Sequence, residues 1–152
     1  MSAAIRWRGA VSKRLETLRA LLAVGAGGCL GTLTRAATAH AWPTTGLPLA
    51  TLAVNLVGAF ALGLLLGALA GREGRAQRVL RLGVGTGFMG GLTTYSTFVL
   101  QVHGLVHDGD PARAATYLLG SLAAGLAAAA VGLWVGSALA TSRAGGGQEA
   151  GT

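Results

Sequence analysis

Charged side chains are scarce in this sequence of 152 residues, and acidic ones are the scarcest. Charged residues make up 11% of the chain, against ~25% in soluble domains. Hydrophobic residues make up 52%. A soluble domain this small exposes too much surface to cover with so few charges, whereas lipid tolerates an apolar exterior. The composition therefore excludes an ordinary soluble domain and predicts an integral membrane protein.

The sequence also lacks the residue clusters that most enzymes and metalloproteins need. Its one cysteine, Cys29, cannot form an intrachain disulfide and lies in an apolar run, as packing cysteines do. No group of His and Cys residues has metal-ligand spacing. All five acids lie outside the centres of the apolar runs: Glu16, Glu73, Asp108, Asp110 and Glu149. We therefore expect no paired carboxylates for acid–base catalysis and no enzyme.

The net charge of +7 comes from basic residues at the ends of apolar runs, without interleaved aromatics. We therefore expect no nucleic-acid partner. Nine basic residues precede or open the first run or lie in the second loop: Arg6, Arg8, Lys13, Arg14, Arg19, Arg72, Arg75, Arg78 and Arg81. The other side holds Arg113 and, at the end of the first run, Arg35. By the positive-inside rule, this bias predicts a multi-pass protein of the cell membrane with both termini in the cytoplasm.

Four apolar runs are long enough to cross a hydrocarbon core of roughly 30 Å. They cover about residues 18–41, 47–70, 79–107 and 112–140. Asp110 followed by Pro111 is a typical helix start. We therefore expect an all-α protein with four transmembrane helices over residues 18–140. A basic cytoplasmic arm would precede them at residues 1–17, and a disordered Gly-rich tail would follow at residues 141–152.

The third run is the least regular of the four. Its middle, residues 83–98, combines many glycines with β-branched hydroxyl residues, which weaken a helix. We predict a break at Gly90 to Thr94. Irregular backbone at membrane depth is tolerated only where protein buries it or where it lines a wet cavity. Glycines also recur four residues apart, which predicts close helix packing: Gly27/Gly31, Gly63/Gly67, Gly83/Gly87/Gly91 and Gly132/Gly136.

Several polar or aromatic residues in the apolar runs each allow two interpretations. Arg35 either extends to the membrane surface or attracts an anion into a vestibule. Asn55 either bonds another helix or lines a pathway. The hydroxyls of the third run either bond their own backbone or form a polar cluster; they are Thr93, Thr94, Ser96 and Thr97. Tyr95 and Phe98, on one face, either pack in the core or point ring edges, which are partly positive, at an anion.

Together these residues resemble the CrcB/Fluc family of fluoride channels. The stretch from Thr86 to Phe98 is similar to the broken-helix signature of that family. Gly28 to Arg35 resembles its first-helix Gly-x-x-Gly-x-x-x-Arg pattern, and Leu49 to Gly58 its second-helix segment ending in Asn-x-x-Gly. Order and spacing agree over about residues 18 to 140.

The resemblance implies a dual-topology, antiparallel dimer with two fluoride pathways. It also implies a structural Na⁺ at the dimer centre, held by the backbone carbonyls of Gly90 and Thr93. The pathway positions carried over are Arg35, Asn55, Tyr95, Ser96, Thr97, Phe98 and, by a looser match, Ser121.

Two features depart from the family pattern. Tyr95 stands where the family usually has Phe, so this ring can donate through its hydroxyl. The strong charge bias also differs, because a subunit that forms inverted homodimers should show little of it. We therefore expect an oppositely oriented, homologous partner subunit.

Three functions are compatible with a small protein of four membrane spans. The leading hypothesis is a passive fluoride channel that exports fluoride and lowers its cytoplasmic concentration. A small multidrug-type proton-coupled exporter is the alternative, but it needs an acid in the first span, and Glu16 is too peripheral. A non-transporting assembly subunit would explain the glycine pairs but not the polar cluster of the third run.

Overall fold

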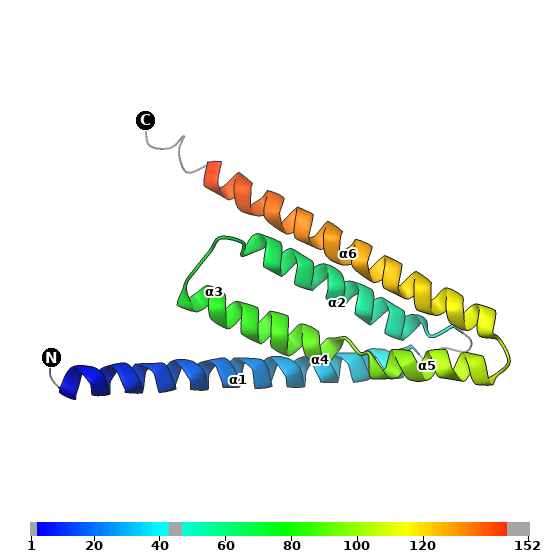
Figure 1. The fold of residues 1–152 in the computed structure, drawn as a ribbon, viewed down its shortest axis with the longest axis horizontal. Helices are drawn as coiled ribbons and strands as arrows, with labels where there is room; N and C mark the ends of the chain where they lie inside the picture. Colours follow the sequence, from blue (N-terminus) through cyan, green and yellow to red (C-terminus); the bar gives the residue numbers. More distant parts are fainter. Residues whose placement is uncertain (1–2, 43–46, 146–152) are drawn as a thin grey trace.

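The computed structural model describes residues 3–42 and 47–145. Helix α1 (Ala3–Ala41) and helix α2 (Leu49–Ala68) are the first two rods of the bundle. The third rod is in pieces: α3 (Arg75–Leu80), the π-helical η1 (Arg81–Met89), α4 (Gly90–Leu92) and α5 (Ser96–His107). The last rod is α6 (Pro111–Gly145). Figure 1 shows the start of α1 and the end of α6 at the same end of the bundle. The prediction of four helical rods, the third interrupted, is confirmed.

Within the described residues, three helices are long and apolar enough to cross a membrane. They are Ser12–Ala41 of α1, the whole of α2, and Pro111–Ser142 of α6. The third rod is missing from this set because its interruptions leave no helix of sufficient length. The outer faces of α1 and α6 expose large apolar side chains, including Leu22, Leu126 and Trp134 at 63%, 71% and 72% of their surface. Such faces suit contact with lipid acyl chains.

The helix ends follow the sequence signals in most places. Helix α1 ends at Ala41, as expected, and the backbone N–H of Arg113 donates to the carboxylate of Asp110 over 3.0 Å, the expected N-cap of α6. Helix α2 begins at Leu49, two residues after the start of the expected run, with Pro48 at its N-cap. The expected loop after Trp42 falls at residues 43–46, outside the described part of the chain.

Both terminal segments are more helical than their composition indicates. The arm expected at residues 1–17 is continuous with α1 from Ala3 onward. At 1.5 Å per residue, this helix is about 58 Å long, roughly twice the thickness of a hydrocarbon core. At the other end, α6 continues to Gly145, although the tail was expected from residue 141. The rest of that tail, residues 146–152, lies outside the described residues.

The glycine pairs lie where two helices touch, as predicted. Helix α1 packs against η1 and α4, and α2 packs against α6 (Figure 1). At Gly27 and Gly31, an added Cβ would come within 3.0 Å of the backbone of η1 or α4, and at Gly63 and Gly132 it would do so at the α2–α6 contact. Only glycine permits backbones to approach this closely. The bundle is therefore two close pairs of helices.

The interruption of the third rod lies slightly later than predicted. Gly90 remains helical in α4, where the N–H of Thr93 still donates to the Met89 carbonyl over 2.9 Å. The extended residue is Thr93, with ψ of 155°, and the next helix begins at Ser96. The predicted break at Gly90 to Thr94 is therefore wrong in its first half. The physical reason is that Gly91 packs on the α1 backbone, which stabilises the helical turn despite its poor propensity.

Candidate functional site

One side chain from α2 stabilises the break in the third rod. The Asn55 Nδ2 donates to the Thr94 carbonyl over 3.0 Å, and the Thr94 N–H donates to Asn55 Oδ1 over 2.8 Å. This pair of bonds satisfies backbone groups that a continuous helix would pair internally. Asn55 therefore bonds another helix, and it also lines a cavity beside the break, so its two interpretations are not exclusive.

The hydroxyl groups of the third rod gather around Thr94. Its Oγ1 donates to Thr97 Oγ1 over 3.1 Å and lies 3.4 Å from Ser96 Oγ. The same oxygen accepts the backbone N–H of Thr97 over 3.2 Å, as an N-cap does at a helix start. Thr93 differs, because its hydroxyl donates to the Met89 carbonyl one turn earlier. The structure therefore brings Thr94, Ser96 and Thr97 into one polar cluster and leaves Thr93 bonded to its own helix.

The two carbonyls expected to bind a cation lie on either side of the last turn of α4. The N–H of Thr94 bonds Asn55 instead of the Gly90 carbonyl that a continuous helix would offer it. The Thr93 carbonyl is turned out of the helix by its extended ψ. Its described partner is Arg35, whose Nη1 donates over 3.4 Å, the long limit for such a bond. Both oxygens therefore retain the capacity to bind a cation.

A cavity of about 510 Å³ lies between α2, η1, α5 and α6, directly beside the break. Its lining includes seven of the residues singled out from the sequence: Asn55, Gly90, Thr93, Thr94, Tyr95, Phe98 and Ser121. Most of the remaining wall is apolar, with Leu52, Leu56 and Leu62 among its residues. A few polar groups in an apolar wall are typical of a ligand site.

Two aromatic rings flank Phe98 at the edge of this cavity. The ring centroids of Phe98 and Tyr117 are 5.2 Å apart, and those of Phe98 and Tyr95 are 6.5 Å apart. Both pairs are tilted, as aromatic quadrupoles favour. Phe98 and Tyr117 are buried, but Tyr95 is 78% exposed. Tyr95 and Phe98 are therefore neighbours, as their spacing predicted, yet only Phe98 belongs to the core of this chain.

Arg35 lies on the other side of the break, at a smaller cavity of about 190 Å³. Thr97 and Thr51 line this smaller cavity, and Thr94 lines both cavities. The guanidinium therefore sits beside the polar cluster rather than in the aromatic cavity. Ser96 is exposed and lines neither of these two cavities.

Ser121 carries a polar atom without a partner. Its Oγ is buried and forms no hydrogen bond with the described residues. A serine hydroxyl in a membrane helix often bonds its own backbone, as Ser137 does with the Leu133 carbonyl over 2.8 Å. Because an unpaired buried hydroxyl is costly, Ser121 is a group available to a ligand in the larger cavity.

The structure also joins three polar residues that the sequence reading passed over. Gln101 Nε2 donates to Thr51 Oγ1 over 2.8 Å, and the Tyr117 hydroxyl donates to Gln101 Oε1 over 3.1 Å. Thr51 is one turn before Asn55 on α2, and Tyr117 is one turn before Ser121 on α6. An uncharged amide in an apolar run was the available signal: Gln101 meets the same criterion that singled out Asn55.

Comparisons with known proteins cover this whole site. The family model described as "CrcB-like protein, Camphor Resistance (CrcB)" matches residues 22–133. The fluoride-specific ion channel FluC 1 of Cutibacterium acnes is 50% identical over 103 residues, which are 65% of this chain and 72% of that protein. The fluoride-specific ion channel FluC of Phenylobacterium zucineum is 41% identical over 76% of this chain and 94% of that protein. The fluoride-specific ion channel FluC 2 of Moorella thermoacetica is 44% identical over 77% of this chain and 93% of that protein.

Proposed function

The chain belongs to the CrcB family, and on this premise we propose that it is a fluoride-specific ion channel of the membrane. It conducts rather than catalyses. Fluoride enters a cell as the neutral weak acid and is trapped inside as the anion. An open and selective exit therefore lowers the cytoplasmic fluoride concentration without an energy source.

The observation that carries this proposal is the helix break beside a cavity with few and weak donors. The Asn55 amide has two N–H groups, and Thr94 uses one of them. The other N–H and the unpartnered hydroxyl of Ser121 are available to an anion in the same cavity. The ring edge of Phe98 adds a partly positive surface. Such contacts replace part of the hydration shell of fluoride and are weak enough to release it, as conduction requires.

Arg35 supplies the positive charge that draws the anion toward the break. It lies at the smaller cavity with Thr97, and Thr94 connects the two cavities. Charges in low-dielectric clefts concentrate ions of opposite sign. In this proposal fluoride passes from the Arg35 side along the hydroxyls of Ser96 and Thr97 to the aromatic cavity.

An antiparallel dimer completes the channel. Tyr95 is 78% exposed at the break, and the space around Gly90 is open. Lipid cannot satisfy irregular backbone and polar groups, so another protein surface must cover them. The charge bias of the loops favours one orientation with both termini in the cytoplasm, and hence an oppositely oriented homologous partner. Reporter tags at both termini test this assignment: comparable amounts of the two orientations would rule out a fixed topology.

The carbonyls of Gly90 and Thr93 suit a structural Na⁺ at the dimer centre. Both are hard oxygen donors freed from the helix by the break, and an inverted second subunit would supply two more. The bound ion would supply fixed positive charge that holds the two breaks together. Arg35, which contacts the Thr93 carbonyl, would orient that oxygen from within its own subunit.

Proton-coupled export receives no support from the position of the acids. Glu16, near the start of the candidate span in α1, forms an ion pair with Arg75 over 2.8 Å at one end of the bundle. It is therefore a peripheral, paired carboxylate, whereas a proton-coupled exporter needs one inside the membrane.

The substitution Asn55→Asp tests the proposed pathway. It replaces the donor amide by an acceptor with negative charge while retaining nearly the same volume. We expect fluoride efflux from liposomes to fall at least tenfold. Unchanged efflux in this variant would remove Asn55 from the pathway.

A further inference from the structure

A cavity of about 260 Å³ lies far from the break, between the first part of α1 and α3. Four charged residues line it: Glu16, Arg19, Arg75 and Arg78. We call these residues the arginine pocket. Glu16 and Arg19 are three residues apart on α1, and Arg75 and Arg78 are three residues apart on α3, so each pair lies on one face of its helix. The conduction pathway does not use them.

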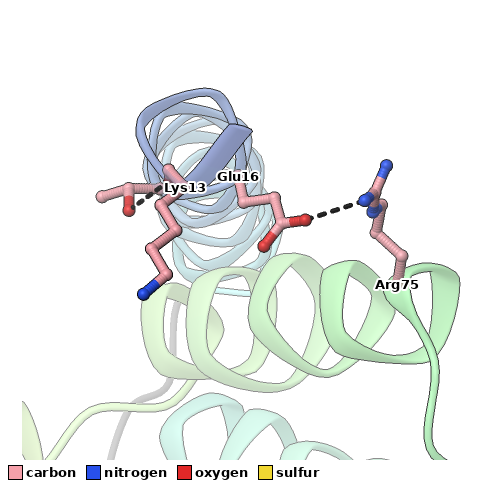
Figure 2. A network of polar contacts seen from close by, with 4 residues as sticks. Lys13, Glu16 and Arg75 are labelled. Atoms are coloured by element: carbon pink, nitrogen blue, oxygen red, sulfur yellow. Dashed lines mark hydrogen bonds and ion pairs between the residues drawn. The ribbon is translucent and has the colours of Figure 1, made fainter. Parts of the chain in front are cut away.

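One ion pair neutralises the only acid of the arginine pocket. Glu16 Oε1 lies 2.8 Å from Arg75 Nη2. Figure 2 shows Glu16 and Lys13 extending from α1 toward the neighbouring helix, with Arg75 reaching back to meet Glu16. Among the side chains that the structure describes, no acid lies within ion-pair distance of Arg19 or Arg78. The pocket therefore has two guanidinium groups to offer an anion.

The charged rim of the pocket leads into an apolar wall. On both helices the charged residues come first, and Ala20, Val79 and Leu82 follow them along the chain as lining residues. Both helices start at the same end of the bundle and run in the same direction (Figure 1). At the same level of α1 but on its other side, Leu18 and Leu21 are 52% and 64% exposed. The rim thus lies where the apolar belt begins, at the depth of lipid headgroups.

From this arrangement we infer that the arginine pocket binds the phosphate headgroup of an anionic membrane lipid, with an acyl chain along the apolar wall. Guanidinium groups match phosphate oxygens in geometry and charge. Basic pockets between membrane helices are suited to anionic headgroups. Free phosphate shares the headgroup chemistry, but it would leave the apolar wall uncovered. The lipid would link α1 to α3 at the surface, where the described side chains otherwise provide one exposed ion pair, a weak contact.

Native mass spectrometry of the purified protein tests this inference, with phosphatidylglycerol and phosphatidylcholine titrated separately. The test variant is Arg19→Gln with Arg78→Gln. The matched control is Arg14→Gln with Arg72→Gln, which removes the same charge outside the pocket. A guanidinium that binds a phosphate oxygen directly should contribute about fivefold to phosphatidylglycerol affinity, whereas a basic residue outside the pocket acts only through salt-screened attraction over a distance. We expect the test variant to lose roughly 30-fold in phosphatidylglycerol affinity and the control to lose less than a third as much.

Three outcomes would overturn the inference. Equal losses in both variants would assign the binding to general surface charge. If the unmodified protein bound phosphatidylcholine as tightly as phosphatidylglycerol, the anionic headgroup would have no role. Displacement of phosphatidylglycerol by millimolar inorganic phosphate would identify a free phosphate site. Fluoride efflux measured on the same preparations keeps this result separate from the channel proposal, because the pocket can fail to bind lipid while fluoride still passes.

Discussion

The amide of Asn55 forms two hydrogen bonds with the backbone of Thr94, a residue 39 positions later in the chain. The side chain takes the place of the helical partner that the backbone of Thr94 lacks. This contact fixes the third rod in its broken form and leaves Thr94 between the two cavities. It is the structural basis of the predictions for the break.

The substitution Asn55→Leu should collapse or destabilise the break. It leaves the N–H and the carbonyl of Thr94 without partners, at a cost of about 1–3 kcal/mol for each group. We expect a lower thermal unfolding temperature in detergent and a loss of fluoride efflux. Thr116→Val is the control, since its hydroxyl bonds only the Ala112 carbonyl of its own exposed turn. If Asn55→Leu unfolds no earlier than this control, the amide does not hold the break.

Two glycines of α1 should respond oppositely to alanine. At Gly31 an added Cβ meets the backbone of Phe88 and Leu92, whereas at Gly25 it meets nothing within 4 Å. We expect Gly31→Ala to destabilise the protein by about 1–3 kcal/mol through overpacking. Gly25→Ala should be neutral or stabilising, because alanine is the better helix former. The yield of monodisperse protein and its unfolding temperature measure both effects. Equal unfolding temperatures for the two variants would contradict the close approach of α1 to the backbone of the third rod.

The sequence predicted the parts of the fold that depend on composition and local spacing. The glycine pairs indicated close helix packing, but periodicity alone could not say that Gly27 faces η1 or that Gly63 faces α6. The hydroxyl-rich stretch indicated a break, yet its position depends on Asn55, a contact between distant segments. The amide of Gln101 in an apolar run indicated a buried contact, but its partners on two other helices could not be identified from the sequence. The dimer and the bound cation stay predictions from the resemblance.

Phe98 should matter for conduction through its ring and not only through its volume. Its ring packs between Tyr95 and Tyr117 at the larger cavity. Phe98→Leu keeps an apolar side chain but removes the partly positive ring edge. We expect fluoride efflux to fall at least tenfold while the protein remains folded. Phe60→Leu, at a side chain of α2 that is 36% exposed and does not line the larger cavity, is the matched control and should conduct normally. Normal efflux in Phe98→Leu would assign Phe98 to packing alone.

Ser121→Ala should separate conduction from stability. The Ser121 hydroxyl is buried without a partner, so its removal should leave the unfolding temperature unchanged or slightly raised. If the hydroxyl contacts the passing anion, fluoride efflux should fall several-fold. Ser137→Ala, which removes a hydroxyl bonded within its own helix, should not alter efflux. A Ser121→Ala protein that is less stable but conducts normally would show that the hydroxyl has a structural partner and no role in the pathway.

The central claim is selective passive conduction of fluoride through the cavity beside the break. Its most direct test loads liposomes with potassium fluoride or potassium chloride and follows anion efflux after a potassium ionophore is added. The protein is reconstituted alone and, in a second arm, after co-expression with an oppositely oriented homologous subunit. We expect fluoride to leave rapidly in at least one arm while chloride is retained in both. If fluoride leaves no faster than chloride in either arm, the chain is not a fluoride channel.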